Sequence, residues 1–255
     1  MPDDIVARLR AAGCVFAEDE ARLIGDAAKD QAELLAMVAR RVAGLPLEHV
    51  LGWAEFRGLR ITVEPGVFVP RARTEFLVEQ AAALTPAGAI VVDLCCGSGA
   101  LGVALADAAA VAELHSVDVD PVAAACAAVN LAAIGTAYLG DLYQPLPPSL
   151  RGRVDIVVAN VPYVPSGEVP LLPAEARLHE ARIALDGGAD GFDVLRRVAA
   201  GAPSWLKPGG HLLIETSARQ ASLASAVFAE HRLRARIASS AESGSTVIIG
   251  SRLGP

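Results

Sequence analysis

The sequence of 255 residues contains no uninterrupted apolar run of about 18 residues, the length that a membrane-spanning helix needs, although 53% of its residues are hydrophobic. Its first residues, Met1 to Asp4, are acidic and lack the basic-then-apolar order of a secretory signal. We therefore expect a globular protein of the cytoplasm with no membrane partner. The length suffices for one large domain with a small additional one.

The sequence also lacks an excess of positive charge: its formal net charge is −7, and its only lysines are Lys29 and Lys207. Proteins that bind nucleic-acid phosphates usually present a basic face, so a nucleic acid is a poor candidate for the direct substrate. Cysteine is scarce too: the sequence has 4, which are Cys14, Cys95, Cys96 and Cys126. Their spacing fits neither a zinc site nor a thioredoxin motif. We expect reduced, structural thiols and no metal site.

Helical periodicity dominates residues 1–44. Apolar residues such as Ile5 and Leu9, and later Leu34 and Val38, recur at the spacing of one helix face. The segment from Gly44 to Pro46 then ends this pattern. The sequence therefore predicts a small helical domain over residues 1–44.

A different pattern occupies residues 45–68. Two short, partly alternating runs within residues 53–63 are split by Arg57 and Gly58, which predicts a β-hairpin. Residues 45–68 are thus predicted to connect the helical domain to a larger domain over residues 69–255. Near the start of this larger domain, Thr74 is placed to cap a helix over residues 75–84.

Strand and helix patterns alternate through the larger domain. We predict strands at 89–93, 113–119, 137–139, 154–159 and 211–215, and helices at 100–109, 121–133, 192–205 and 218–231. Repeated units of this kind form a mostly parallel sheet with helices on both faces. Two further strands, 233–238 and 246–250, are joined by a short turn and must be antiparallel to each other. The predicted fold class is α/β: a doubly wound, Rossmann-like sheet of seven strands with an antiparallel last strand.

The first predicted strand leads into a glycine-rich loop, residues 93–102. Gly97, Gly99 and Gly102 satisfy Gly-x-Gly-x-x-Gly, in which glycine lets the backbone turn tightly and approach a ligand. Because Cys95 carries a Cβ atom, we expect no positive φ there, with its side chain packed inward and that of Cys96 near the ligand. The candidate cofactor-binding residues of this loop are Asp93, Cys95, Cys96, Gly97, Ser98 and Gly99.

Two acidic residues follow the next predicted strands. Asp118 ends the second strand about twenty residues after the loop, where a carboxylate accepts hydrogen bonds from both hydroxyls of a ribose. Asp141 and Leu142 follow the third strand and complete the cofactor candidates. NAD and S-adenosylmethionine share the need for a ribose acceptor, and an ordinary solvated turn is the alternative reading of these aspartates.

The most distinctive segment follows the strand at 154–159. Five of its six residues, from Val154 to Ala159, are apolar, which predicts a strand buried on both faces. Asn160, Val161, Pro162 and Tyr163 come next, at the end of the strand where ligands bind in open α/β sheets. Alone, this segment also fits a simple strand-terminating turn. In register with the glycine loop it predicts a substrate site.

Asn-Val-Pro-Tyr resembles the Asn-Pro-Pro-Tyr signature of amino-group methyltransferases, with Val161 in place of the first proline. Further segments extend this resemblance to the peptide chain release factor glutamine N5-methyltransferase family: Leu-Pro-Leu-Glu-His-Val-Leu-Gly at 45–52, Glu-Phe-Arg-Gly at 55–58, Val-Pro-Arg at 69–71 with Thr74 and Glu75, and the glycine loop. The resemblance implies a class I methyltransferase fold, S-adenosyl-L-methionine as cofactor, and a release factor as partner. The methyl acceptor would be the glutamine of its Gly-Gly-Gln motif.

The resemblance also implies roles for the parts of the chain. The helical domain, shorter here than is usual in that family, would recognise the protein substrate, while Asn160, Val161, Pro162 and Tyr163 would be catalytic, with Asn160 also at the cofactor. An amide nitrogen is a weak nucleophile, so two acceptors, the Asn160 side-chain oxygen and the Val161 carbonyl, would orient it for in-line attack. Tyr163 would stack on the amide plane.

Three other readings stay open at this point. A DNA or RNA amino-methyltransferase would use the same tip on a flipped base, but the acidic net charge counts against it. An inactive paralogue that binds S-adenosylmethionine is the second, and an NAD oxidoreductase, which explains neither the tip nor the closing antiparallel strands, is the third. Weaker candidates for the site are Arg71, Arg73, Tyr143, His179 and Glu180.

Overall fold

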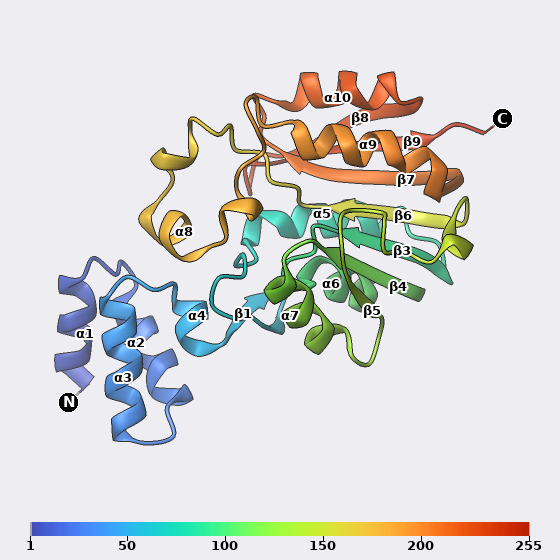
Figure 1. Cartoon of the computed structure of the whole chain (residues 1–255). Coiled ribbons are helices and arrows are strands. Elements are labelled where there is room, and N and C mark those ends of the chain that lie inside the picture. The colour runs from blue at the N-terminus through green and yellow to red at the C-terminus, as the bar shows by residue number, and fades with distance from the viewer. Residues whose placement is uncertain (1, 255) are drawn as a thin grey trace.

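The computed structural model of the protein describes residues 2–254 and shows a helical region beside a larger α/β region (Figure 1). The helical region consists of α1 (Pro2–Ala11), α2 (Ala17–Ala27), α3 (Gln31–Val42) and the short α4 (Leu47–Leu51). Asp30 caps α3, because its carboxylate accepts the Glu33 N–H at 2.8 Å. The four helices share one apolar cluster that includes Leu9, Ile24 and Val38. Helix α4, which was not predicted, adds Val50 to that cluster.

One ion-pair network joins the helical region to the rest of the chain. Arg41 on α3 donates to both carboxylate oxygens of Glu20, at 2.5 and 3.1 Å, and to the Leu45 carbonyl at 2.9 Å. The same guanidinium reaches Glu175, 2.6 Å away, at the start of α8 (Ala174–His179). The Arg41 and Glu20 side chains are only 10% exposed, whereas that of Glu175 is 52% exposed. Arg41 therefore joins α3 to α2 within the helical region and also to α8 outside it.

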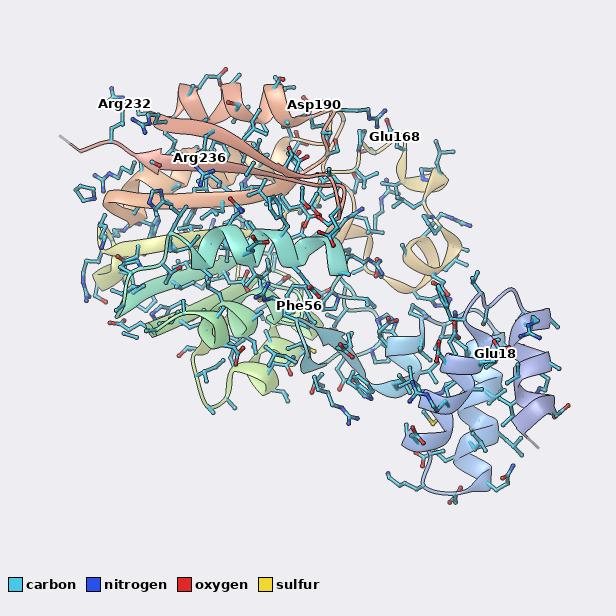
Figure 2. All side chains as sticks on the ribbon, turned by 180° about the vertical axis from the view of Figure 1, so that it is seen from behind. Glu18, Phe56, Glu168, Asp190, Arg232 and Arg236 are labelled. Atoms are coloured by element: carbon cyan, nitrogen blue, oxygen red, sulfur yellow. The ribbon has the colours of Figure 1, made fainter. Side chains whose placement is uncertain are left out.

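The predicted hairpin is confirmed as β1 (Trp53–Phe56) and β2 (Leu59–Thr62), which pair antiparallel. Phe56 is buried and packs with the core of the larger region where the two regions meet (Figure 2). The 3-10 turn η1 (Ala72–Thr74) then leads into α5 (Glu75–Ala82). The predicted cap of α5 is wrong: Thr74 makes no side-chain capping bond, because it lies in helical conformation (φ −71°) with its side chain buried.

The larger region contains the predicted sheet of seven strands, in the order β5-β4-β3-β6-β7-β9-β8. The strands are β3 (Ala89–Leu94), β4 (Val111–Asp118), β5 (Thr136–Leu139), β6 (Val154–Ala159), β7 (Leu206–Thr216), β8 (Leu233–Ser240) and β9 (Ser245–Arg252). Pairing is parallel from β5 through β7, and β9 pairs antiparallel with both β7 and β8. The α/β fold class is thus confirmed.

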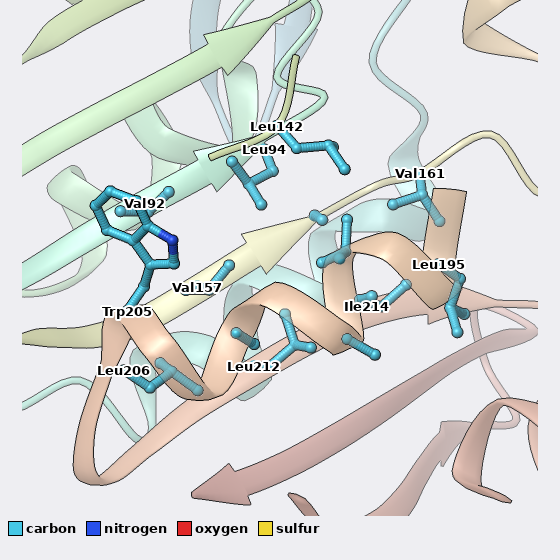
Figure 3. Close-up of a cluster of buried hydrophobic side chains, with 14 of the residues drawn as sticks. Val92, Leu94, Leu142, Val157, Val161, Leu195, Trp205, Leu206, Leu212 and Ile214 are labelled. Carbon is cyan, nitrogen blue, oxygen red and sulfur yellow. The ribbon is translucent and has the colours of Figure 1, made fainter. Parts of the chain in front are cut away.

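Helices cover both faces of this sheet, as predicted. One face packs against α9 (Asp193–Trp205) and α10 (Ala221–Glu230), and Trp205, Leu195 and Leu212 lie in that core (Figure 3). The other face packs against α5, α6 (Ala100–Ala108) and α7 (Pro121–Leu131). Every residue of β3 and β6 is buried, so these two strands form the centre of the molecule. Exposed charge gathers on the edge strand β8, where Arg236 projects outward (Figure 2).

Two smaller differences from the prediction have local causes. Strand β7 begins at Leu206, earlier than predicted, because Gly209 adopts φ 79° and accommodates a register shift opposite β6. The loop between β6 and α9 is not continuous coil, since it contains α8 and the turns η3 (Val169–Leu171) and η4 (Arg182–Ala184). Among the described residues, no helix has the length and apolar content required to cross a membrane.

The Arg41 network generates a stability prediction. Arg41→Met should lower the free energy of unfolding by about 3–5 kcal/mol, because it leaves the buried Glu20 carboxylate without its cation. Glu175→Gln is the matched control: it removes a half-exposed partner of the same arginine and should cost at most about 1 kcal/mol. Urea denaturation followed by circular dichroism measures both losses. Equal, small losses for the two variants would contradict this account of the network.

Candidate active site

A cavity of about 940 Å³ opens at the carboxyl ends of β3, β4 and β6. Parallel strands present their carboxyl ends at one edge of a sheet, so residues far apart in sequence meet there. The cavity wall contains most of the predicted site residues, namely Cys95, Cys96, Gly97, Ser98, Asp118, Asp141, Leu142, Asn160, Val161, Pro162 and Tyr163. Asp93 and Gly99, by contrast, lie behind the wall.

The glycine loop forms one side of the cavity and turns sharply between β3 and α6. Gly97 and Gly99 have φ values of 56° and 79°, and a Cβ atom on Gly99 would lie 2.7 Å from the Leu131 side chain. The positive φ and the close Leu131 and Ala127 side chains therefore favour glycine at position 99. The expectation of no positive φ at Cys95 is wrong, because its φ is 53°, whereas the expected inward packing is confirmed. Its partly buried side chain packs against the large core, and this packing offsets the cost of a left-handed residue with a Cβ atom.

Asp93 supports the loop from below. Its carboxylate is fully buried, and one oxygen accepts the Gly102 N–H at 3.0 Å while the other has no partner among the described residues. Burial raises the pKa of the Asp93 carboxyl to about 8. This residue shapes the first turn of α6 and does not face the cavity. Its predicted contact with a cofactor stays a prediction.

Asp118 sits at the cavity wall at the end of β4. One carboxylate oxygen accepts the Gly97 N–H at 2.8 Å, and the other accepts the Asp120 N–H at 2.9 Å. Two backbone amides thus fix the orientation of the group and tie it to the glycine loop. Each oxygen has further lone pairs, so the fixed carboxylate is suited to accept two vicinal hydroxyls. Burial raises the pKa of Asp118, an effect that the amide hydrogen bonds oppose.

Asp141 and Leu142 form the neighbouring part of the wall. Leu142 adopts φ 50° and is buried, with its side chain directed toward the core cluster (Figure 3). Asp141 forms an ion pair with Arg197 of α9, a contact that sequence reasoning missed because 56 residues separate the partners. The Asp141 carboxylate is therefore held at the cavity by a second cavity residue.

The tip after β6 forms the opposite side of the cavity. Asn160 is half-buried in the wall, whereas the Val161 side chain is 1% exposed and belongs to the large core (Figure 3). Valine at this position is thus anchored by apolar packing. The Tyr163 ring lines the cavity, and burial raises the pKa of its hydroxyl.

Two glycines of the following loop press against the tip. A Cβ atom on Gly187 would lie 2.6 Å from the Pro162 carbonyl oxygen, and one on Gly191 would lie 2.4 Å from that of Tyr163. Gln220 donates to the same Tyr163 carbonyl at 3.0 Å. The backbone of the tip is therefore held from behind by close contact and a hydrogen bond.

Asn130 on α7 is a structural residue of the site that sequence reasoning missed. Its amide nitrogen donates to the Ser98 carbonyl at 2.8 Å and to the Thr62 carbonyl at 2.9 Å, and its oxygen accepts the Thr62 N–H at 3.0 Å. One side chain thus connects the hairpin to the glycine loop. No motif marks this residue, because its partners are backbone atoms.

The weaker candidates divide into two groups. Tyr143 is buried and donates to the Val198 carbonyl at 3.0 Å, and His179 lies half-buried at the end of α8, so neither contacts the tip. Glu180 is buried, accepts the Val69 N–H at 3.1 Å and pairs with Arg71 at 2.5 Å. Arg71 and Arg73 both line the cavity.

The buried carboxyl of Asp93 predicts an unusual pH dependence. Its pKa of about 8 lies above the ordinary 3.8, so between these values the folded state holds a proton that the unfolded state has released. The free energy of unfolding of the cofactor-free protein should therefore fall as pH rises through this window. Asp93→Asn keeps an oxygen for the Gly102 N–H and cannot titrate, so its stability relative to wild type should rise with pH. Urea denaturation over this pH range measures both proteins. If their free energies of unfolding changed with pH by the same amount, this assignment would be wrong.

Comparisons with known proteins agree with this geometry. Residues 58–190 match the family model described as the methyltransferase small domain. The chain is 37% identical over 221 residues to the release factor glutamine methyltransferase of Geobacter sulfurreducens, an alignment that covers 86% of this chain and 77% of that protein. It is 43% identical over 190 residues to the protein of the same name from Mycolicibacterium smegmatis, covering 72% and 67% of the two chains.

Among solved structures, a methyltransferase from Pyrococcus furiosus superposes with a TM-score of 0.60 over 88% of this chain and 98% of that one. Its sequence identity of 13% means that this likeness concerns the fold alone. The curated relatives go further, because their identity extends over most of both chains. The chain belongs to the release factor glutamine methyltransferase family, whose members are S-adenosylmethionine-dependent enzymes.

Proposed function

We propose that this protein transfers a methyl group from S-adenosylmethionine to the side-chain amide nitrogen, N5, of the glutamine in the Gly-Gly-Gln motif of a peptide chain release factor. The observation that carries this proposal is the meeting, in one cavity, of the glycine loop with Asp118 on one side and Asn160 to Tyr163 on the other. The family membership supports the same reaction. The proposed partner places the protein's activity in the cytoplasm.

The cofactor side of the cavity fits S-adenosylmethionine. The glycine loop turns at Gly97, whose φ of 56° favours glycine, and this turn presents the loop to the cavity. Asp118, oriented by two amide hydrogen bonds, would accept the ribose hydroxyls, and the segment around Asp141 and Leu142 would border the adenine. When bound there, the cofactor supplies an electrophilic methyl group on a sulfonium centre.

The tip supplies orientation at the other side. The nitrogen of a glutamine amide is a weak nucleophile because its lone pair is delocalised into the carbonyl, so its attack depends on alignment. The Asn160 side-chain oxygen would accept one amide hydrogen and the Val161 carbonyl the other. Val161 keeps this carbonyl in place of a proline's, and its buried side chain anchors the backbone instead of a ring. Tyr163 would cover the amide plane and exclude water.

No strong base is required in this scheme. The amide proton becomes acidic only once the nitrogen carries the methyl group, so it leaves after the transfer, to the acceptors that already hold it or to water. Arg71 and Glu180 form an internal ion pair at the edge of the cavity, and the Glu180 carboxylate is engaged by Arg71 and by the Val69 amide. Both contacts go to one oxygen of Glu180, the other oxygen is buried with no partner among the described residues, and the contacts tie the residue to Arg71 and to the backbone of Val69.

We infer that the helical region recognises the protein substrate. It contacts, through Arg41 and Glu175, the same segment that forms the rim of the cavity at Leu172, Pro173 and Ala176. A release factor gripped by α1 to α3 would therefore reach the cavity across α8. In this arrangement residues 1–44 act in recognition, residues 45–68 connect, and residues 69–255 carry the chemistry.

A methylation assay tests the function directly. The protein, incubated with S-adenosylmethionine and a full-length bacterial release factor, should add one methyl group to the glutamine of Gly-Gly-Gln, as read by mass spectrometry of the tryptic peptide. A release factor with that glutamine replaced by glutamate is the matched control and should stay unmodified. If the protein binds S-adenosylmethionine but modifies no release factor, the proposed substrate is wrong and the fold assignment stands.

Two variants should separate binding from transfer. Asp118→Ala removes the ribose acceptor and should weaken S-adenosylmethionine binding by about 1.5–3 kcal/mol, the scale of a hydrogen bond to a charged group. Asn160→Ala removes the acceptor that orients the amide, and should slow single-turnover methyl transfer by about 2–4 kcal/mol with a much smaller change in cofactor affinity. Calorimetry and rapid-quench kinetics measure the two quantities. A fully active Asn160→Ala protein would remove this residue from the mechanism.

A further inference from the structure

The Tyr163 hydroxyl is hydrogen-bonded by a residue from outside the tip. Arg73 lies in η1, far earlier in the chain, and its Nη2 atom donates a short hydrogen bond to the Tyr163 hydroxyl. The Arg73 guanidinium carbon lies 6.0 Å from the centre of the Tyr163 ring. Both residues line the cavity. The hydroxyl end of the ring is thus fixed by a cation, while its backbone end is fixed by the tip itself.

Arg73 is in turn held by two strands at the end of the sheet. Its Nε atom donates to Glu215 of β7 at 3.1 Å, and its backbone carbonyl accepts the Ser245 hydroxyl, at the start of β9, at 2.6 Å. The Glu215 side chain is only 3% exposed, and its second oxygen has no hydrogen-bond partner within residues 2–254. Burial raises the pKa of this carboxyl, whereas the neighbouring Thr74 hydroxyl and the charge of Arg73 lower it. The arginine is therefore the cation that this buried site requires.

The planar fork of arginine is needed for this arrangement. A guanidinium presents separate N–H groups in fixed directions, so one side chain can hold a carboxylate with Nε and a hydroxyl with Nη2 at the same time. A lysine has one nitrogen on a flexible stem and cannot bridge the two in the same geometry. Glu215 also neutralises the guanidinium. The ring is thereby oriented without adding a net positive charge beside a site that receives a sulfonium cofactor.

Arg71 shows that the contact is specific to position 73. It lies two residues earlier in the same segment and also lines the cavity, but its guanidinium pairs with Glu180 and lies over the Phe68 ring, 4.9 Å from its centre. The two arginines therefore contact different aromatic rings and pair with different buried carboxylates. Only Arg73 contacts the tip that would hold the substrate.

We propose that Arg73 is a positioning residue for methyl transfer, which acts through the Tyr163 hydroxyl and is itself aligned by Glu215. This inference rests on the proposed function, in which the Tyr163 ring covers the amide of the substrate glutamine. Loss of Arg73 leaves the ring in place but free to rotate and tilt. The alignment of the amide then loosens, while the cofactor side of the cavity is unaffected.

A double-mutant cycle tests whether Arg73 acts through Tyr163. Arg73→Met and Tyr163→Phe should each slow single-turnover methylation of the release factor by about tenfold to a hundredfold, the effect of imperfect alignment. The double variant should be no slower than the slower single variant, and S-adenosylmethionine should bind all four proteins with dissociation constants within about twofold. Arg73→Lys, which keeps the charge but loses the fork, should resemble Arg73→Met. The inference would be overturned if the rate losses of the two single variants multiplied in the double variant, or if Arg73→Met methylated the release factor at the wild-type rate.

The contact itself has a readout that does not depend on activity. The chain has 3 tyrosines, so the signal of Tyr163 in protein carrying labelled tyrosine is assigned by its loss in Tyr163→Phe. Arg73 lowers the pKa of the Tyr163 hydroxyl, so Arg73→Met should raise its titration midpoint, and Glu215→Gln, which removes the neutralising charge, should lower it. Unchanged midpoints would overturn the inference even if no release factor is methylated. Shifted midpoints without methylation would instead count against the proposed substrate alone.

Discussion

The site depends on the parallel pairing of β3 with β4 on one side and with β6 on the other. This main-chain ladder fixes where three strands end, and therefore where the glycine loop, Asp118 and Asn160 lie relative to one another. The pairing is protected because every residue of β3 and β6 is buried between two layers of helices. Burial on both faces makes a slip of register costly, since it would move polar residues at the strand ends into the core.

Around this frame, charged groups are fixed mainly by backbone amides and by arginines from distant segments. Asp118 is oriented by the N–H groups of Gly97 and Asp120, and Asp93 by that of Gly102. Arginines hold three further carboxylates around the cavity, those of Asp141, Glu180 and Glu215. Arginine suits these three positions because its planar guanidinium group makes directed contacts.

The sequence allowed much of this to be predicted. Periodicity and turn residues placed the strands within a few positions, because buried parallel strands have a strong apolar signal, and the ordered motifs indicated which strand ends would face the cavity. The conformation of Cys95 was not predictable, since propensity disfavours φ 53° there and only core packing offsets it. The partners of Tyr163 and Asp141 were missed for another reason: Arg73 and Arg197 lie far away in sequence, and one chain carries no signal for such pairs.

Asn130 couples the β1–β2 hairpin to the glycine loop. Its single amide group holds the last residue of the hairpin, Thr62, and the glycine loop at Ser98. A shift of the hairpin therefore disturbs the loop, and a ligand that immobilises the loop also stabilises the hairpin. Coupling free energies are reciprocal. A partner that rigidifies the hairpin would therefore increase the affinity of the loop for its ligand by the same factor by which that ligand increases the affinity of the hairpin for the partner. A protein partner that bound the hairpin would in this way be linked thermodynamically to a small ligand at the glycine loop.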